Sequence, residues 1–162
     1  MRNGTASTQM FTLTCTALAA AGLLAICGIA LASDEAGTIK TLKGTASVER
    51  DGQKTPAALG GKVMVSDRIL TGPESSIGIT LRDNTLLSAG ANSTLVLNRF
   101  AFDSTTHAGA LDATVKRGTL AVVSGKIAKA SPDKVIFNTP SVALGVRGTE
   151  FIIDAGQRDG DK

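Results

Sequence analysis

The chain has 162 residues and a net charge of +3, from 17 basic and 14 acidic residues, and 43% of its residues are hydrophobic. This length suits one domain. Both cysteines lie in the first 32 residues, and the rest of the chain has no Trp or Tyr and one histidine, which excludes for that part a disulfide framework, a thiol nucleophile, a cysteine-ligated metal and a dense basic patch for nucleic acid.

The N-terminus has the pattern of an export signal. Arg2 is followed by an uncharged stretch over residues 11–32, which ends in a small-x-small site at Ala30-Leu31-Ala32. This pattern predicts a signal helix over residues 1–32, cleaved between Ala32 and Ser33, and a periplasmic location. The alternative is an uncleaved helix over residues 11–32 that anchors the chain in the inner membrane, because about 20 apolar residues can span a bilayer.

The rest of the chain reads as short strands. Residues 76–82 alternate strictly between apolar and polar, the pattern of a half-buried strand. Similar runs occur at residues 45–49, 94–98, 111–116, 120–124, 135–137, 142–146 and 151–154. Turn-forming pairs separate them at intervals of about 8–12 residues. We predict an all-β fold, a two-sheet sandwich or β-roll of about 10–12 short strands, with a linker at 33–37, the β domain at 38–154 and a polar tail at 155–162.

Helical patterning is weak in this part of the chain. No segment keeps a 3.6-residue period over three turns, and the best candidate, residues 104–116, fits a strand equally well in its second half. Residues 102–109 are expected to form a polar loop. We expect a core of Val, Ile, Leu and Ala, completed by four phenylalanines at positions 100, 102, 137 and 151.

Two segments echo each other. Gly44-Thr45-Ala46-Ser47-Val48 is similar to Gly118-Thr119-Leu120-Ala121-Val122, and in both a Gly-Thr pair precedes a predicted strand. We interpret this echo as shared turn chemistry.

Several motifs follow one another in order along the chain. They are Gly44-Thr45-Ala46-Ser47-Val48 with Asp51-Gly52, Asp67-Arg68-Ile69-Leu70-Thr71-Gly72, the run 76–85 leading to Gly90-Ala91-Asn92-Ser93-Thr94-Leu95, Gly118-Thr119-Leu120, Thr139-Pro140 and Val146-Arg147-Gly148-Thr149-Glu150-Phe151. In this order and spacing they resemble the FecR domain, the periplasmic part of the iron-dicitrate regulator family, over residues 38 to about 154.

The resemblance implies an all-β domain of the bacterial envelope that works by contacting other proteins. In the full-length regulators this domain relays the state of an outer-membrane transporter to a sigma factor. Here we expect a free-standing exported domain. We also expect it to lack a strand after residues 151–154, which leaves an open edge and invites self-association. The alternative is a frayed polar tail or an early stop.

The residues whose side chains could serve catalysis or metal binding are expected to have structural roles instead. His107 is a lone histidine in a polar loop, so no second imidazole completes a zinc site. Ser131 and Lys134 match a Ser-x-x-Lys spacing, but we expect them between strands rather than on the helical turn that this motif requires. Asp67 and Thr71 are expected to accept hydrogen bonds at turns.

Arg147, Gly148 and Thr149 form the one candidate for a partner-binding site. Arg147 either anchors a partner or binds backbone carbonyls at a turn, for which its five donors are suited. Taken together, the residues and the resemblance predict a non-catalytic, protein-binding and regulatory module in the periplasm, with no cofactor, metal or nucleic acid. Its expected partners are envelope proteins, such as an outer-membrane transporter or a membrane regulator. A structural envelope component, secreted or membrane-tethered, is the alternative.

Overall fold

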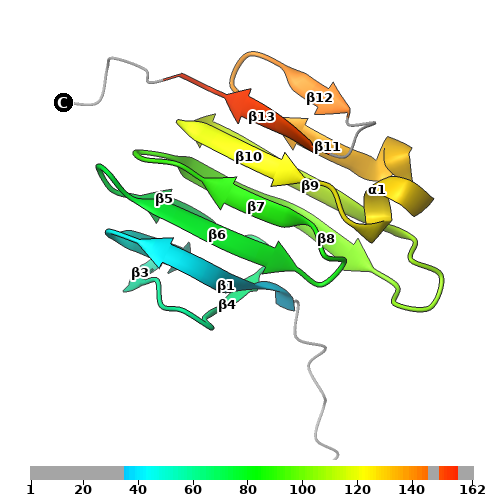
Figure 1. Ribbon diagram of the computed structural model, residues 1–162, viewed down its shortest axis with the longest axis horizontal. Helices are drawn as coiled ribbons and strands as arrows, with labels where there is room; N and C mark the ends of the chain where they lie inside the picture. The colour runs from blue at the N-terminus through cyan, green and yellow to red at the C-terminus, as the bar shows by residue number, and fades with distance from the viewer. Residues whose placement is uncertain (1–34, 146–149, 157–162) are drawn as a thin grey trace, which may run out of the picture. The chain divides into compact units, whose positions relative to one another are not determined.

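The computed structural model describes residues 35–145 and 150–156, which form two packed β-sheets with little helix (Figure 1). The six-stranded sheet contains, in spatial order, β13 (Glu150–Asp154), β10 (Thr119–Val123), β7 (Leu86–Ala89), β6 (Ser76–Leu81), β1 (Glu35–Lys43) and β4 (Lys62–Met64). The seven-stranded sheet contains β12 (Ala143–Gly145), β11 (Val135–Asn138), β9 (Gly109–Arg117), β8 (Thr94–Phe102), β5 (Arg68–Thr71), β2 (Ala46–Arg50) and β3 (Gln53–Pro56). The predicted all-β, two-sheet fold is confirmed. The predicted signal helix and its cleavage site at Ala32 and Ser33 lie outside the described residues.

The β domain starts and ends a few residues away from the predicted boundaries. Residues 35–37, expected in the linker, belong to β1, and Ala36 is fully buried. Glu35 at the start of this strand pairs with Lys62 of β4 at 2.6 Å. At the other end, Ala155 and Gly156 extend the pairing of β13 through hydrogen bonds to Gly118. Only the residues after 156 could form the predicted polar tail, and they lie outside the described part of the chain.

The core between the sheets is almost entirely aliphatic. The alternating residues of β6, β7, β8, β9 and β10 point inward, and most of them are less than 3% exposed. Of the four phenylalanines expected in the core, Phe137 is completely buried, while Phe100, Phe102 and Phe151 are only half-buried and pack against its margin. These three phenylalanines are only partly buried because of where they lie. Phe100 and Phe102 are near the end of β8, and Phe151 is on an edge strand.

The Gly-Thr echo of the sequence corresponds to two matching arches that carry the chain from one sheet to the other. At the first arch, the Thr45 N–H donates to the Ser75 hydroxyl (2.9 Å), and the Gly72 N–H donates to the Thr45 carbonyl (2.8 Å). This arch links β1 to β2 and faces the connection from β5 to β6.

The second arch repeats these bonds with different residues. The Thr119 N–H donates to the Ser93 hydroxyl (3.0 Å), and the Gly90 N–H donates to the Thr119 carbonyl (3.0 Å). Gly44 and Gly118 precede the two threonines with φ of +72° and +80°, a conformation that glycine adopts without steric cost. The shared turn chemistry is thus confirmed, and four of the sequence motifs serve these arches.

A short helix that the sequence did not reveal closes the opposite end of the sandwich. Helix α1 (Lys126–Ala130) has five residues and is followed by the 3-10 helix η1 (Pro132–Lys134). It is too short to show a 3.6-residue period over three turns. It is held by Asp83, whose buried carboxylate accepts a hydrogen bond from the Ile127 N–H (3.3 Å), while Ile127 itself is fully buried.

The candidate helix at 104–116 is a strand in its second half, since β9 begins at Gly109, and the loop before it spans residues 103–108. Ser131 and Lys134 do lie on a helical turn, because α1 and η1 meet there and the Lys134 N–H donates to the Ser131 carbonyl (3.0 Å). They lie between β10 and β11, as expected, but the expectation that they are not on a helical turn is wrong. Their side chains share no hydrogen bond with each other among the described residues.

Candidate functional site: an uncharged sheet face and its open edge

The predicted partner-binding residues Arg147, Gly148 and Thr149 lie outside the described residues. In the chain they stand between β12, an edge strand of the seven-stranded sheet, and β13, an edge strand of the six-stranded sheet. Their roles, as a partner anchor or as a turn, stay predictions. The described residues around them identify a surface that the sequence analysis did not find.

Exposed apolar side chains gather near these two edge strands. Seven large hydrophobic residues in the described part of the chain are exposed. Six of them belong to β7, β10, β13, β11 or β12 or to the turn before β12: Leu86, Val123, Ile152, Ile136, Val142 and Leu144. The seventh, Leu59, precedes β4 at the opposite edge of the six-stranded sheet. Single exposed apolar residues are ordinary, but a contiguous group of them marks an interaction surface.

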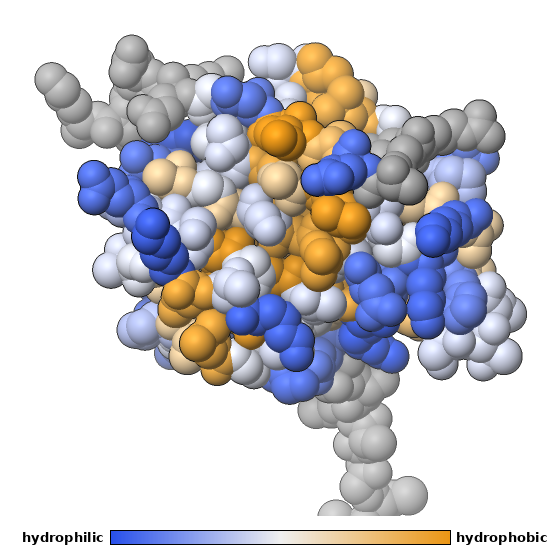
Figure 2. Space-filling model, in the orientation of Figure 1, coloured by the Kyte–Doolittle hydropathy of each residue, from blue (hydrophilic) through white to orange (hydrophobic). Residues whose placement is uncertain are grey.

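The outer face of the six-stranded sheet carries Leu86, Val123 and Ile152 in two rows that cross the strands. Residues paired across an antiparallel ladder place their side chains on the same face. The strand registers therefore define one row of Thr38, Thr80, Leu86, Val123 and Glu150, and a second row of Thr41, Gly78, Ser88, Ala121 and Ile152. We call these ten residues the apolar face. Its only ionisable residue is Glu150, at the sheet edge. Figure 2 looks onto this side of the molecule and shows apolar side chains gathered across its middle.

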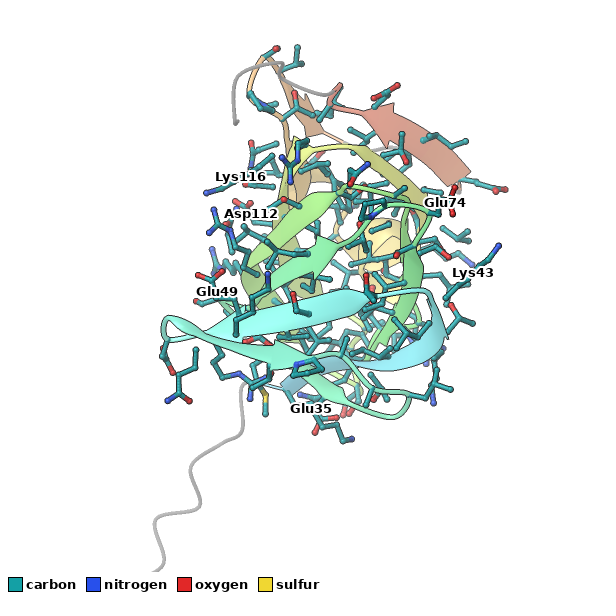
Figure 3. The ribbon with its side chains drawn as sticks, turned by 90° about the vertical axis from the view of Figure 1, so that its left-hand side faces the viewer. Glu35, Lys43, Glu49, Glu74, Asp112 and Lys116 are labelled. Atoms are coloured by element: carbon teal, nitrogen blue, oxygen red, sulfur yellow. The ribbon has the colours of Figure 1, made fainter. Side chains whose placement is uncertain are left out.

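The outer face of the other sheet is mostly polar and charged, although the exposed Ile136 also lies on it. Arg68 and Glu49 form an ion pair across β2 and β5 (3.6 Å). Asp112 accepts hydrogen bonds from the side chains of Asn98 (2.8 Å) and Asn138 (2.9 Å), which join three neighbouring strands. Figure 3 shows Glu49, Asp112 and Lys116 on this side of the sandwich and Lys43 on the other. The two rows of the apolar face therefore differ in chemistry from this charged face, although Lys43 and Asp154 lie beside those rows on the same sheet. A protein that covers the two rows removes few charged groups from water.

A buried carboxylate, Asp67, and a buried hydroxyl, Thr71, are both engaged in holding the fold. Asp67 is completely buried, and it accepts hydrogen bonds from the Met64 N–H (2.7 Å) and from two guanidinium nitrogens of Arg50 (2.7 Å each). The hydrogen bond to Asp67 raises the pKa of Arg50 above its usual value. Thr71 is also buried, donates to the Gly90 carbonyl and accepts from the Ser93 N–H (2.8 Å). The predicted turn-stabilising roles of Asp67 and Thr71 are confirmed.

The other residues considered for chemistry are also accounted for. His107 is exposed, as expected for a polar loop, and its ring stacks on Phe102 with 6.2 Å between the centroids. The described residues contain no cluster of three or more His, Cys, Asp or Glu side chains with the geometry of a metal site. A shallow hollow of about 760 Å³ beside the two arches has Lys54 and Arg117 in its lining. None of the helices in the described part of the chain is long and apolar enough to cross a membrane.

The comparisons with known proteins point to one family. No curated protein matches the chain. A solved structure titled "Cell surface anchoring domain" is 30% identical to it, with a TM-score of 0.36, over 37% of this chain and 80% of its own. The profile of the family described as FecR protein matches residues 67–161, more than half of the chain, and this range contains β5 to β13. The chain belongs to the FecR family.

Proposed function

We propose that this chain acts in the periplasm as an exported, non-catalytic module that binds an envelope protein and so takes part in regulation. FecR-family proteins are regulatory proteins and not enzymes, and FecR domains are periplasmic. The observation that carries the proposal for this chain is the apolar face. Its two rows of side chains cross five strands and contain a single ionisable group.

A protein partner fits this surface better than a small molecule does. Ligand sites for small molecules are concave and enclose most of the ligand. The apolar face instead follows the surface of a sheet, and its threonines, serine and glycine let another protein approach closely. Uncharged centres with a few charged residues at the rim are typical of protein interfaces. Glu150 stands at the rim here.

The proposal is tested by crosslinking in intact bacteria that express the full chain with a tag, followed by capture and mass spectrometry. Two variants serve as matched baits. A double variant, Leu86→Lys with Val123→Lys, adds charge to the apolar face, whereas Leu59→Lys adds charge at an exposed residue elsewhere. We expect the native chain and Leu59→Lys to capture the same envelope protein, such as a transporter or a membrane regulator, and the double variant to lose it.

The same experiment reports on export and on the alternative function. A captured chain whose mass begins at Ser33 supports cleavage and a periplasmic location. Capture of the chain itself or of cell-wall fragments alone, with a full-length mass in the membrane fraction, contradicts the proposal and supports a tethered structural component.

A further inference from the structure

The four edge strands of the sandwich differ in how they are protected against pairing with another chain. A strand edge with free backbone groups is a template for a further strand. Edge β3 carries Lys54 and Pro56, and both residues discourage pairing. Edge β4 has only three residues, and side chains cover it: Arg50 donates to the Lys62 carbonyl (3.3 Å), and the Met64 N–H donates to Asp67.

Of the two edges at the other side of the sandwich, β13 lacks these devices. Edge β12 is short, with three residues (Ala143–Gly145). Edge β13 has five residues, contains no Lys, Arg, Pro or Gly, and pairs with β10 alone among the described strands. At its centre, Ile152 is 74% exposed, the largest exposed fraction among the large hydrophobic residues of the described chain.

The backbone of β13 presents regularly spaced donors and acceptors along this edge. The Ala155 N–H donates to the Gly118 carbonyl, so Ala155 faces β10 through its backbone. Ile153 and Phe151 follow at intervals of two residues and pair with Leu120 and Val122 of β10. Because backbone groups alternate in direction along an antiparallel strand, Phe151 and Ile153 bond to β10. The N–H and C=O groups of Glu150, Ile152 and Asp154 therefore point to the open edge.

The side chains beside this edge define the chemistry of the strand that would complement it. On the outer face, β13 presents Glu150, Ile152 and Asp154, an acidic–apolar–acidic pattern. Neither acidic residue forms an ion pair with any described residue. On the inner side, Phe151 is half-buried and packs edge-on against Phe137 (5.3 Å between centroids). Leu144 pairs with Phe137 across β11 and β12, so it also faces inward, and it is 38% exposed.

We propose that β13 binds an extended segment of another protein as a seventh, antiparallel strand of its sheet, and that this segment has the pattern basic–apolar–apolar–apolar–basic. The two basic residues would face Glu150 and Asp154, and the central apolar residue would face Ile152. The two remaining residues would point inward and cover Phe151 and Leu144. This inference rests on the proposed function and specifies how the partner binds.

A second copy of the chain complements this edge poorly. If two β13 strands paired antiparallel about Ile152, Glu150 of each copy would face Asp154 of the other. Like charges directly opposite each other destabilise a strand pair. The self-association expected from the sequence thus becomes one of the outcomes that the experiment distinguishes.

The test measures binding of the synthetic peptide acetyl-Ser-Lys-Val-Ile-Val-Lys-Ser-amide to the full chain in mild detergent, by fluorescence anisotropy with a labelled copy. Two control peptides keep its length and its three apolar side chains. One has glutamate in place of both lysines, and the other carries N-methyl groups on the lysines and the isoleucine, whose N–H groups would face β13. We expect each control peptide to bind at least tenfold more weakly, because the first loses charge complementarity and the second loses the ladder hydrogen bonds.

Variants of the chain test whether the peptide binds at β13. Ile152→Pro removes an N–H that faces the open edge and not β10, so the pairing with β10 keeps its hydrogen bonds. It should weaken peptide binding at least tenfold, whereas Leu59→Lys should leave it unchanged. If Ile152→Pro unfolds the chain, Ile152→Lys provides the same test with the backbone donor kept, since it puts a positive charge opposite the peptide's isoleucine and on the same face as its two lysines.

Three results would overturn the inference: equal affinity for the acidic and basic peptides, unchanged binding after substitution at Ile152, or a dimer of the chain that disappears on the same substitution. Failure of this test leaves the proposed function standing if the native chain still captures an envelope protein through the apolar face. Failure of both tests removes the proposed function as well.

Discussion

The Asp67 carboxylate, which has no solvent exposure, accepts two hydrogen bonds of 2.7 Å from the Arg50 guanidinium. Arg50 ends β2, and Asp67 precedes β5, its neighbour in the sheet. The pair therefore joins the end of a strand to a turn and also covers the edge of β4. The acidic residue that opens the Asp-Arg-Ile-Leu-Thr-Gly motif thus stabilises the fold.

Replacing Asp67 by Asn should destabilise the chain by about 2 kcal/mol, because a charge-assisted bond to a buried group is lost and one amide oxygen cannot serve all three donors. The exposed Asp51→Asn is the control and should change stability by less than about 0.5 kcal/mol. Urea unfolding of both variants measures the difference. Equal midpoints would contradict the role assigned to Asp67.

Gly118→Ala should be more harmful than Gly52→Ala, although both glycines have φ near +80°. A Cβ at position 118 would meet the Ser93 side chain and lie 2.7 Å from its Cα, whereas a Cβ at position 52 would meet nothing within 4 Å. We expect Gly52→Ala to cost about 1 kcal/mol from backbone strain alone, and Gly118→Ala to cost at least twice as much. Thermal unfolding of the two variants checks this, and equal losses would show that the arch can relax.

Asp83→Ala should release helix α1 while the sheets stay folded. The Asp83 carboxylate accepts from the Thr85 N–H (3.0 Å), the Thr85 hydroxyl (2.7 Å) and the Ile127 N–H. Amide hydrogen exchange should become faster at Lys126 and Ile127 and stay slow at Ile79 in the centre of β6. The exposed Asp133→Ala in η1 serves as the control. Unchanged protection of Ile127 would show that packing alone holds the helix.

The loop at residues 103–108 should respond to acid. Hydrogen bonds from the Thr105 and Thr106 N–H groups hold the pKa of Asp103 below its usual value of 3.8. A carboxylate with a lowered pKa stabilises the loop fully above its ordinary pKa, and this contribution is lost as the pH falls through the lowered value. The amide shifts of Thr105 and Thr106 should therefore move in the acid range, and Asp103→Asn should abolish the transition. Amide shifts that stay constant down to about pH 2 would exclude this titration.

The sequence predicted the parts of the fold whose patterns are local. The strict alternation of β6 identified a strand, and the repeated Gly-Thr pairs indicated shared turn chemistry, which the structure places at the two arches. Helix α1 was missed because five residues carry no periodic signal, and its anchor, Asp83, lies more than 40 residues away. The three-residue strand β4 was missed because it depends on pairing with β1 and on cover from Arg50.

The candidate surface could not be read from the sequence for a similar reason. Leu86, Val123 and Ile152 come from three separate strands, and each looks like an ordinary strand residue in its own segment. Only the registers of β7, β10 and β13 show that they lie on one face and outside the core. The sequence did indicate an open edge after residues 151–154, and β13 is an edge strand among the described residues.

The most direct test of the account is position-resolved photocrosslinking in intact bacteria. A photoreactive phenylalanine analogue would replace Leu86 on the apolar face in one chain and Lys116 on the opposite, charged face in another. Both positions are exposed, and both lie on strands that pair on either side. We predict an adduct with an envelope protein from position 86 and none from position 116. An adduct from position 116 alone, or from neither position, would contradict a binding function for the apolar face.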